Sequence, residues 1–151
     1  MAIAPNTNFT AGAVLTATQQ NAFPRGIVAY AQDTANSAAF STAITTLTSS
    51  AFTAVANRYY KVTYYEPSIS YFSGTVNFVQ GTIKNGATVL QIANENVAGQ
   101  RSSVVATYVG TFSAGSVTIT TTMEASGGGA GIGSRSATQP AFVLVEDLGP
   151  A

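Results

Sequence analysis

The stretch "RYYKVTYYEP", Arg58 to Pro67, places four of the chain's seven tyrosines within eight residues. Side chains of a β-strand alternate between two faces, so this run predicts a strand with tyrosines on both faces. One face holds Tyr60, Val62 and Tyr64, and the other holds Tyr59, Lys61, Thr63 and Tyr65. Because a buried lysine is costly unless it is paired, we expect the uncharged face to fill the core.

Two other segments are also apolar on both faces: "PAFVLVED" at 140–147 and "SSVVATYVGTF" at 102–112. By contrast, apolar and polar side chains alternate in "SVTITTTME" at 116–124, which predicts a strand with one face exposed to solvent. A sheet that is apolar on both sides packs against a second sheet on one side and needs a cover on the other. Central strands lying under a loop are the alternative; we favour contact between copies of the chain.

After Gly26 the chain reads as short strands separated by turn residues, with little helical periodicity. Asn85-Gly86 predicts a hairpin with a type I′ turn, and Ala114-Gly115 predicts a second hairpin. We therefore predict that residues 26–151 form an all-β domain, an antiparallel jelly-roll β-sandwich of about eight strands.

The small, polar residues at the start of the chain predict that residues 1–25 form an extended arm with at most one short helix. Thr16 and Gln19 have the spacing of a capping box, which favours a helical turn from Ala17 to Ala22, ended by Pro24. The start "MAIAPNTNF" has neither a basic nor an apolar region, so we expect no signal peptide. We expect the arm to order on binding a larger partner. Its expected attachment residues are Phe9, Val14, Leu15 and Phe23.

Composition narrows the class of partner. The 151 residues suit one domain, and six basic residues balance six acidic ones, with only 8% of residues charged. This argues against nucleic acid or an anionic membrane as a partner, and no apolar run is long enough for a membrane span. Since 46% of the residues are hydrophobic, we expect assembly to hide much of the surface.

The same composition argues against an enzyme. Histidine and cysteine are absent, which removes Ser-His-Asp catalysis and most zinc sites. Glu146 and Asp147 are adjacent in a predicted strand and point to opposite faces, so they do not form a glycosidase pair. "GGGAGIGSR" at 127–135 lacks P-loop spacing, and "NENV" at 94–97 is more typical of a turn than of a calcium site. We expect no catalytic residue, cofactor or metal ion.

Three segments carry a resemblance: "FTAVANRYYKVTYYEPSI" at 52–69, "GTFSAGSVTITT" at 110–121 and "ATQPAFVLVEDLG" at 137–149. Their order resembles the jelly rolls of the tumour necrosis factor and complement globular-head families, although Asn57-Arg58 stands where those families usually have glycine. The resemblance implies a compact homotrimer with one sheet facing the threefold axis. The expected trimer interface comprises Tyr59, Lys61, Thr63, Tyr65, Phe142 and Leu144.

The opening "NFTAGAVLTATQQNAFPRGIVAY" at 8–30 and the ending "ATQPAFVLVEDLGPA" at 137–151 carry a second resemblance. They are similar to small virion proteins of tailed bacteriophages of actinobacteria, such as minor tail proteins. This implies a non-enzymatic structural protein on the particle surface, made in the host cytoplasm. It would be a minor tail or fibre-like protein or a capsid decoration protein, with its arm attached to the capsid or tail.

An alternative function is a receptor-binding module for a host cell-surface glycan. In "YYEPSISYF" at 64–72, the rings of Tyr65, Tyr71 and Phe72 flank Pro67 and are able to stack on sugar rings. The same rings also suit the end of a sandwich or a subunit interface, where tyrosine is enriched. We favour the interface.

Overall fold

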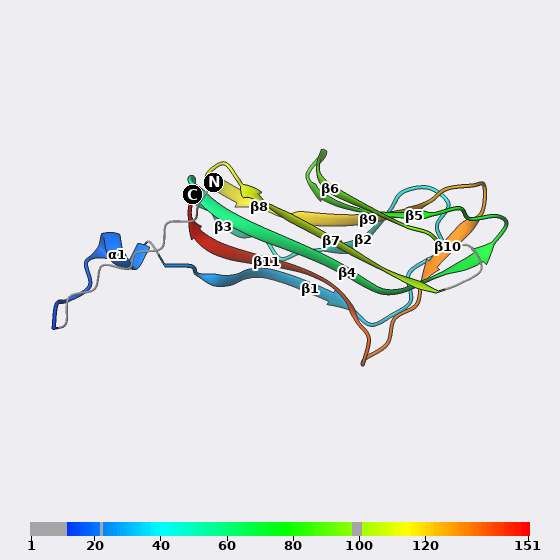
Figure 1. The fold of residues 1–151 in the computed structure, drawn as a ribbon, viewed down its shortest axis with the longest axis horizontal. Coiled ribbons are helices and arrows are strands. Elements are labelled where there is room, and N and C mark those ends of the chain that lie inside the picture. The colour runs from blue at the N-terminus through cyan, green and yellow to red at the C-terminus, as the bar shows by residue number, and fades with distance from the viewer. Residues whose placement is uncertain (1–11, 22, 98–100) are drawn as a thin grey trace.

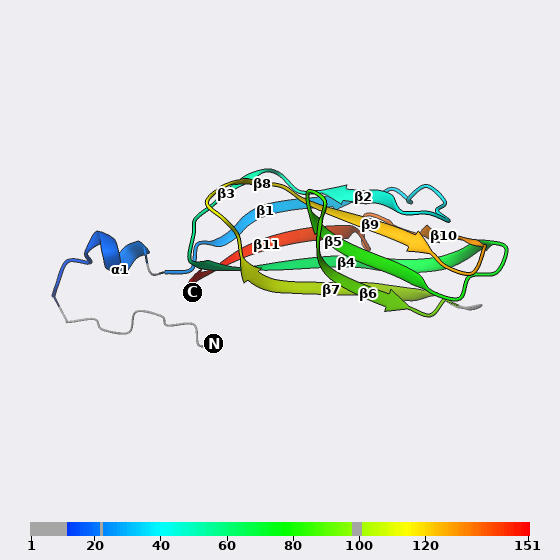
Figure 2. The same cartoon turned by 90° about the horizontal axis from the view of Figure 1, so that it is seen from above.

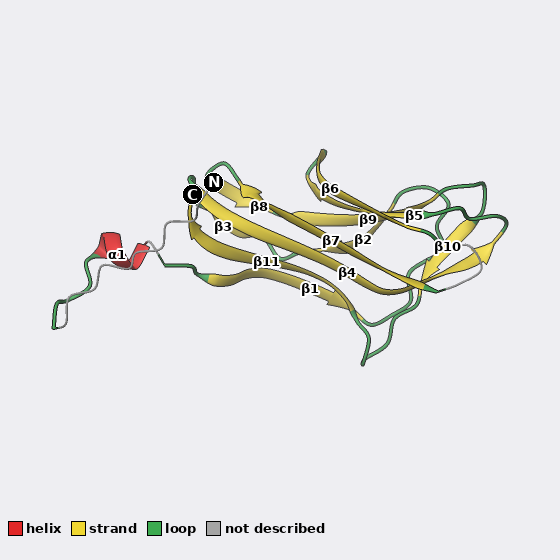
Figure 3. Ribbon diagram, viewed as in Figure 1, coloured by secondary structure: helices red, strands yellow, loops and turns green. Residues whose placement is uncertain are grey.

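The protein is almost entirely β-structure in the computed structural model, which describes residues 12–21, 23–97 and 101–151 (Figure 3). The helix α1 (Ala17–Asn21) precedes the strands. The strands are β1 (Gly26–Asp33), β2 (Ile44–Thr48), β3 (Phe52–Ala54), β4 (Arg58–Ser73), β5 (Val79–Asn85), β6 (Thr88–Glu95), β7 (Ser102–Thr111), β8 (Gly115–Val117), β9 (Ile119–Ala125), β10 (Ala130–Gly133) and β11 (Ala141–Pro150).

Two antiparallel sheets form the layers of a sandwich (Figures 1 and 2). The five-stranded sheet has the order β1-β11-β4-β10, and β7 also pairs with β4. The four-stranded sheet has the order β2-β9-β5-β6, and β3 pairs with β8 in a short third sheet. The all-β, antiparallel sandwich expected from the sequence is confirmed.

The tyrosine-rich stretch begins the longest strand, β4, and its alternation positions the core. Tyr60, Val62 and Tyr64 are at most 1% exposed. The Tyr60 ring packs 5.5 Å from the rings of both Phe52 and Phe112. The expectation that this face fills the core is therefore confirmed. Complete burial of each such side chain stabilises the fold by about 1.5–3 kcal/mol.

The first predicted hairpin is present, with a different turn. Strands β5 and β6 pair with Asn85 opposite Thr88, which leaves Gly86 and Ala87 as a two-residue loop. Of these two, only Gly86 has a positive φ, at 57°. Glycine at the first loop position fits a type II′ turn, whereas a type I′ turn needs a positive φ at both positions.

The second predicted hairpin is wrong. Strand β7 pairs with β4, whereas β8 pairs with β3 and β9 pairs with β2 and β5. The chain therefore crosses from one sheet to the other between β7 and β9. Phe112 turns inward at the crossing and packs against Phe52 with ring centroids 6.0 Å apart. Burial of this ring outweighs the local turn signal at Ala114-Gly115.

The short helix of the arm has the expected start. Thr16 N donates to the Gln19 side-chain oxygen at 2.9 Å, and Gln19 N donates to the Thr16 hydroxyl at 3.2 Å. This reciprocal pair is a capping box. The helix ends at Asn21, and position 22 lies outside the described residues. In Figures 1 and 2, α1 lies beyond the end of the sandwich at which β11 and the chain end.

Candidate functional site

The outward surface of β1, β11, β4 and β7, here called the outer face, carries the residues expected at a subunit interface. Register places their side chains in rows across the four strands. The rows are Gln32–Phe142–Tyr65–Val105, Tyr30–Leu144–Thr63–Thr107 and Ile27–Glu146–Lys61–Val109. Gly149 and Thr111 flank Tyr59 in the next row. The six expected interface residues thus share one face of two adjacent strands, β4 and β11.

An aromatic stripe crosses this face. The Phe142 ring lies 5.4 Å from the Tyr65 ring and 6.4 Å from the Tyr30 ring, measured between centroids. The Tyr30 hydroxyl donates to the Gln32 side chain at 2.7 Å, which orients its ring. Beside the stripe is a shallow apolar pocket of about 440 Å³, lined by Ile27, Tyr30, Phe142 and Leu144. The stripe and pocket form one apolar surface over β4, β11 and β1.

The outer face carries one ion pair among its described side chains. Lys61 Nζ lies 3.1 Å from Glu146 Oε2, and the two residues are neighbours across β4 and β11. This contact forms within one chain. Because the side chains of Lys61 and Glu146 are 41% and 30% exposed, the pair contributes at most about 1 kcal/mol. Val109, next to Lys61, and Val105, next to Tyr65, are each 54% exposed.

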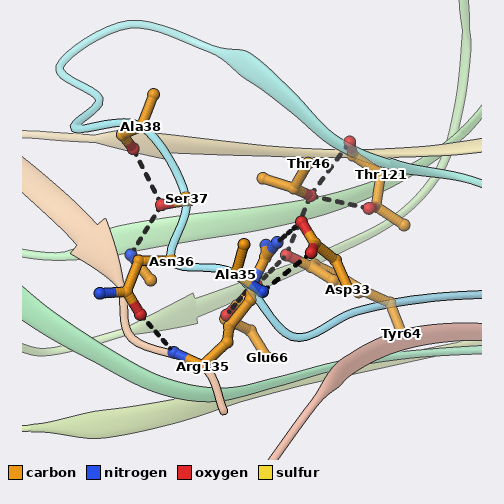
Figure 4. Close-up of polar contacts among 11 residues, drawn as sticks. Asp33, Ala35, Asn36, Ser37, Ala38, Thr46, Tyr64, Glu66, Thr121 and Arg135 are labelled. Carbon is orange, nitrogen blue, oxygen red and sulfur yellow. Dashed lines mark hydrogen bonds and ion pairs between the residues drawn. The ribbon is translucent and has the colours of Figure 1, made fainter. Parts of the chain in front are cut away.

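A buried polar cluster lies on the inner side of β4, farther along the strand (Figure 4). Arg135 donates to both oxygens of Glu66, through Nε at 2.9 Å and through its terminal nitrogen Nη2 at 2.7 Å. Its other terminal nitrogen, Nη1, donates to Asp33 at 2.8 Å. The Tyr64 hydroxyl lies 3.3 Å from Glu66 and 3.2 Å from the Thr46 hydroxyl. These contacts tie β1, β4 and the segment after β10 together.

The electrostatics of this cluster follow from its burial. Burial raises the pKa of Tyr64, and the charge of Glu66 raises it further. For Arg135, burial lowers the pKa, but the hydrogen bond to Glu66 and its charge outweigh burial and leave the pKa raised. Both side chains of the Arg135–Glu66 pair are at most 1% exposed. A carboxylate enclosed in this way is unsuited to meeting a substrate, so the cluster has a structural role.

Sequence reasoning missed this cluster, although a signal for it was present. Glu66 continues the alternation of Tyr60, Val62 and Tyr64, so its position alone indicates a buried carboxylate that needs a partner. The partner, Arg135, is 69 residues away in the sequence, and no local pattern connects the two. The expected separation of Glu146 and Asp147 onto opposite faces is confirmed, since Asp147 is buried and Glu146 lies on the outer face.

The other candidate residues lie toward the two ends of the molecule. Val14 is exposed, Leu15 is partly exposed, and Phe23 is half-buried where the arm meets the sandwich, whereas Phe9 lies outside the described residues. Tyr71 and Phe72 are exposed near the end of β4. Tyr71 lies six positions after Tyr65, which is roughly 20 Å along a strand. The structure therefore does not bring Tyr65, Tyr71 and Phe72 together at one point.

Over the residues that the structure describes, no group of three or more acidic, histidine or cysteine side chains could hold a metal ion. In the same residues, no helix has both the length and the apolar character needed to cross a membrane. In comparisons with known proteins, no family model and no curated protein matches this chain.

Proposed function

We propose that the protein is a non-enzymatic structural protein whose β-domain assembles into a homotrimer through the outer face. The observation that carries the proposal is the composition of that face. Seven of the twelve side chains in its three rows are aromatic or aliphatic, and the other five are Gln32, Thr63, Thr107 and the ion pair Lys61–Glu146. A sheet surface that remains in water is normally polar, whereas a permanent subunit interface resembles a domain core cut in half.

The order of the strands supports a jelly-roll assignment and a trimer. The order β1-β11-β4-β7 lies opposite β2-β9-β5-β6, so the first and last strands are neighbours in the sheet that carries the apolar face. In the tumour necrosis factor-like families that the sequence resembles, one sheet of the jelly roll faces the threefold axis. The outer face would occupy that position, and burial of on the order of 2,000 Å² would suit a permanent assembly.

The proposed place of this trimer is the surface of a tailed bacteriophage particle, as a minor tail or fibre-like protein or a capsid decoration protein. The arm would attach it to the capsid or tail. Support comes from the sequence resemblance and from the described part of the arm. Helix α1 lies beyond the sandwich, and Val14 and Leu15, which precede it, are at least partly exposed. Apolar side chains in such a position suit a segment that docks on another protein.

Deletion of residues 1–18 tests this division of roles. The truncated chain should remain a folded trimer, because the described core begins with the strands, and it should be lost from particles assembled in its presence. Circular dichroism and light scattering measure folding and assembly, and protein analysis of purified particles measures incorporation. Unfolding of the truncated chain would show that the arm belongs to the core, and normal incorporation would show that it is not the attachment segment.

A second candidate function is recognition of a host cell-surface glycan, favoured by one observation: Tyr71 and Phe72 are each at least half exposed. The double variant Tyr71→Ala/Phe72→Ala and the variant Tyr65→Ala separate the two functions. If the trimer persists in these variants but binding to cells or to a glycan array is lost, the rings form a receptor site. If cell binding is unchanged, they do not.

A further inference from the structure

A second buried arginine, Arg58, joins the two central strands at the end of the sandwich nearest the arm. Its Nε donates to Asp147 Oδ2 at 2.8 Å and its Nη2 donates to Asp147 Oδ1 at 2.7 Å. The two side chains are 5% and 1% exposed. Asp147 Oδ1 also accepts a hydrogen bond from Gly149 N at 2.8 Å. The ion pair thus has the planar, two-bonded geometry that arginine provides and lysine does not.

The same guanidinium also reaches the arm. Nη1 donates to the backbone carbonyl of Asn21, and Nη2 donates to the carbonyl of Phe23 at 2.6 Å. Asn21 is the last residue of α1, where helix carbonyls lack partners within the helix. Asp147 fixes the Arg58 guanidinium from the strand side. The remaining N–H donors of the guanidinium bind the arm at Asn21 and Phe23. Three distant parts of the chain therefore meet at one side chain.

We infer that Arg58, held by Asp147, is an anchor that fixes the direction in which the N-terminal arm leaves the β-domain. Through this anchor, the carbonyls of Asn21 and Phe23 are bound to β4 and β11, the central strands of the five-stranded sheet. The anchor goes beyond the proposed function, because it holds whether or not the arm attaches to a particle.

The molecule contains a matched control for this anchor. Arg135 and Glu66 form a second buried ion pair, also with two hydrogen bonds between the guanidinium and the carboxylate. Glu66, like Arg58, belongs to β4. Glu66 lies eight residues after Arg58, roughly 26 Å along a strand. Arg135 is hydrogen-bonded to Glu66, Asp33 and Asn36, none of which belongs to the arm. Changes at Arg135 therefore measure the general effect of weakening a buried pair, and changes at Arg58 add the release of the arm.

Trypsin cleavage after the exposed Arg25, read by mass spectrometry as loss of residues 1–25, tests the inference on the full chain. Arg58→Lys keeps the charge opposite Asp147 but cannot also reach both carbonyls. We expect its cleavage at Arg25 to be at least about tenfold faster than in the wild type, which corresponds to about 1.4 kcal/mol of lost arm contact. Arg135→Lys should leave the rate within about twofold of the wild type.

Equal acceleration in both lysine variants, or a wild-type rate in Arg58→Lys, would overturn the anchor. If Arg58→Lys does not fold, the double variant Arg58→Gln/Asp147→Asn replaces it. That variant removes both charges together and so leaves no unpaired buried charge. Fast cleavage at Arg25 in a folded double variant supports the anchor, and a wild-type rate overturns it. Because this readout requires neither a trimer nor a particle, it does not depend on the proposed function.

Discussion

The two faces of β4 differ more than the alternation of one strand requires. On the inner face, Tyr60, Val62 and Tyr64 are sealed by the second sheet. On the outer face, Tyr65 lies among other aromatic and aliphatic side chains, and in the single chain Val105 and Val109 are each 54% exposed. A sheet that is covered on both sides does not need an amphipathic pattern in its strands. The first cover is within the chain, and we propose that the second is another copy.

The largest expected effect is a loss of subunit stability when a tyrosine on the inner face of β4 is removed, compared with its neighbour on the outer face. Tyr60→Ala removes a ring packed on Phe52 and Phe112 and should destabilise the subunit by about 3–5 kcal/mol. Tyr59→Ala removes a ring from the outer face and should weaken assembly while leaving the subunit fold intact. Urea unfolding at two protein concentrations tenfold apart separates these effects, because only assembly makes the midpoint depend on concentration.

In that experiment, Tyr60→Ala should lower the unfolding midpoint at both concentrations. Tyr59→Ala should lower it more at the lower concentration. If Tyr59→Ala behaves as Tyr60→Ala does, the outer tyrosine belongs to the core of the subunit, and the difference between the faces disappears.

A charge introduced on the outer face should prevent assembly while changing the stability of the subunit less than Tyr60→Ala does. Leu144→Asp places a carboxylate in the apolar pocket beside Phe142 and Tyr30. Its subunit should keep the wild-type circular dichroism spectrum while losing the trimer, since an unpaired charge is costly in an interface. The matched control is Ile92→Asp on β6, an exposed apolar residue of the other sheet. If the trimer survives Leu144→Asp but not Ile92→Asp, the interface lies on the four-stranded sheet, which contradicts the assignment to the outer face.

The smallest expected effect concerns pH and the buried phenol of the inner face. Burial, and then the charge of Glu66, raise the pKa of Tyr64 above its ordinary value of 10.0. The folded state therefore favours the protonated phenol. This contribution to stability is complete below about pH 10 and declines as the pH rises above it. Urea midpoints from about pH 8 to about pH 11 should fall less steeply in Tyr64→Phe than in the wild type.

Tyr71→Phe, which removes an exposed phenol, is the control for that series. An alkaline decline that is unchanged in Tyr64→Phe would contradict the role given to the buried phenol.

Short-range patterns were sufficient to predict part of this fold. The alternation from Tyr59 to Tyr65 identified the core face of β4, because a strand has a period of two residues and Lys61 distinguishes its faces. The capping box at Thr16 and Gln19 identified the helix start, because its contacts span three residues.

Features that depend on distant partners were missed. The passage from β7 to β9 has the turn residues of a hairpin, and burial of Phe112 in the tertiary structure decides that it is a crossing. The pairs Arg135–Glu66 and Arg58–Asp147 join residues 69 and 89 positions apart. Local periodicity contains no information about such pairs, although buried positions such as Glu66 indicate that a partner must exist.

The mass of the 151-residue protein in solution decides whether another copy covers the outer face. Light scattering on the eluate of a size-exclusion column, at micromolar concentration and neutral pH, reports that mass without reference to shape. We expect a mass of three times the 15.4 kDa of the chain, stable on dilution through the micromolar range. A single species of 15.4 kDa would show that the outer face stands in water, and would contradict the proposal that another copy covers it.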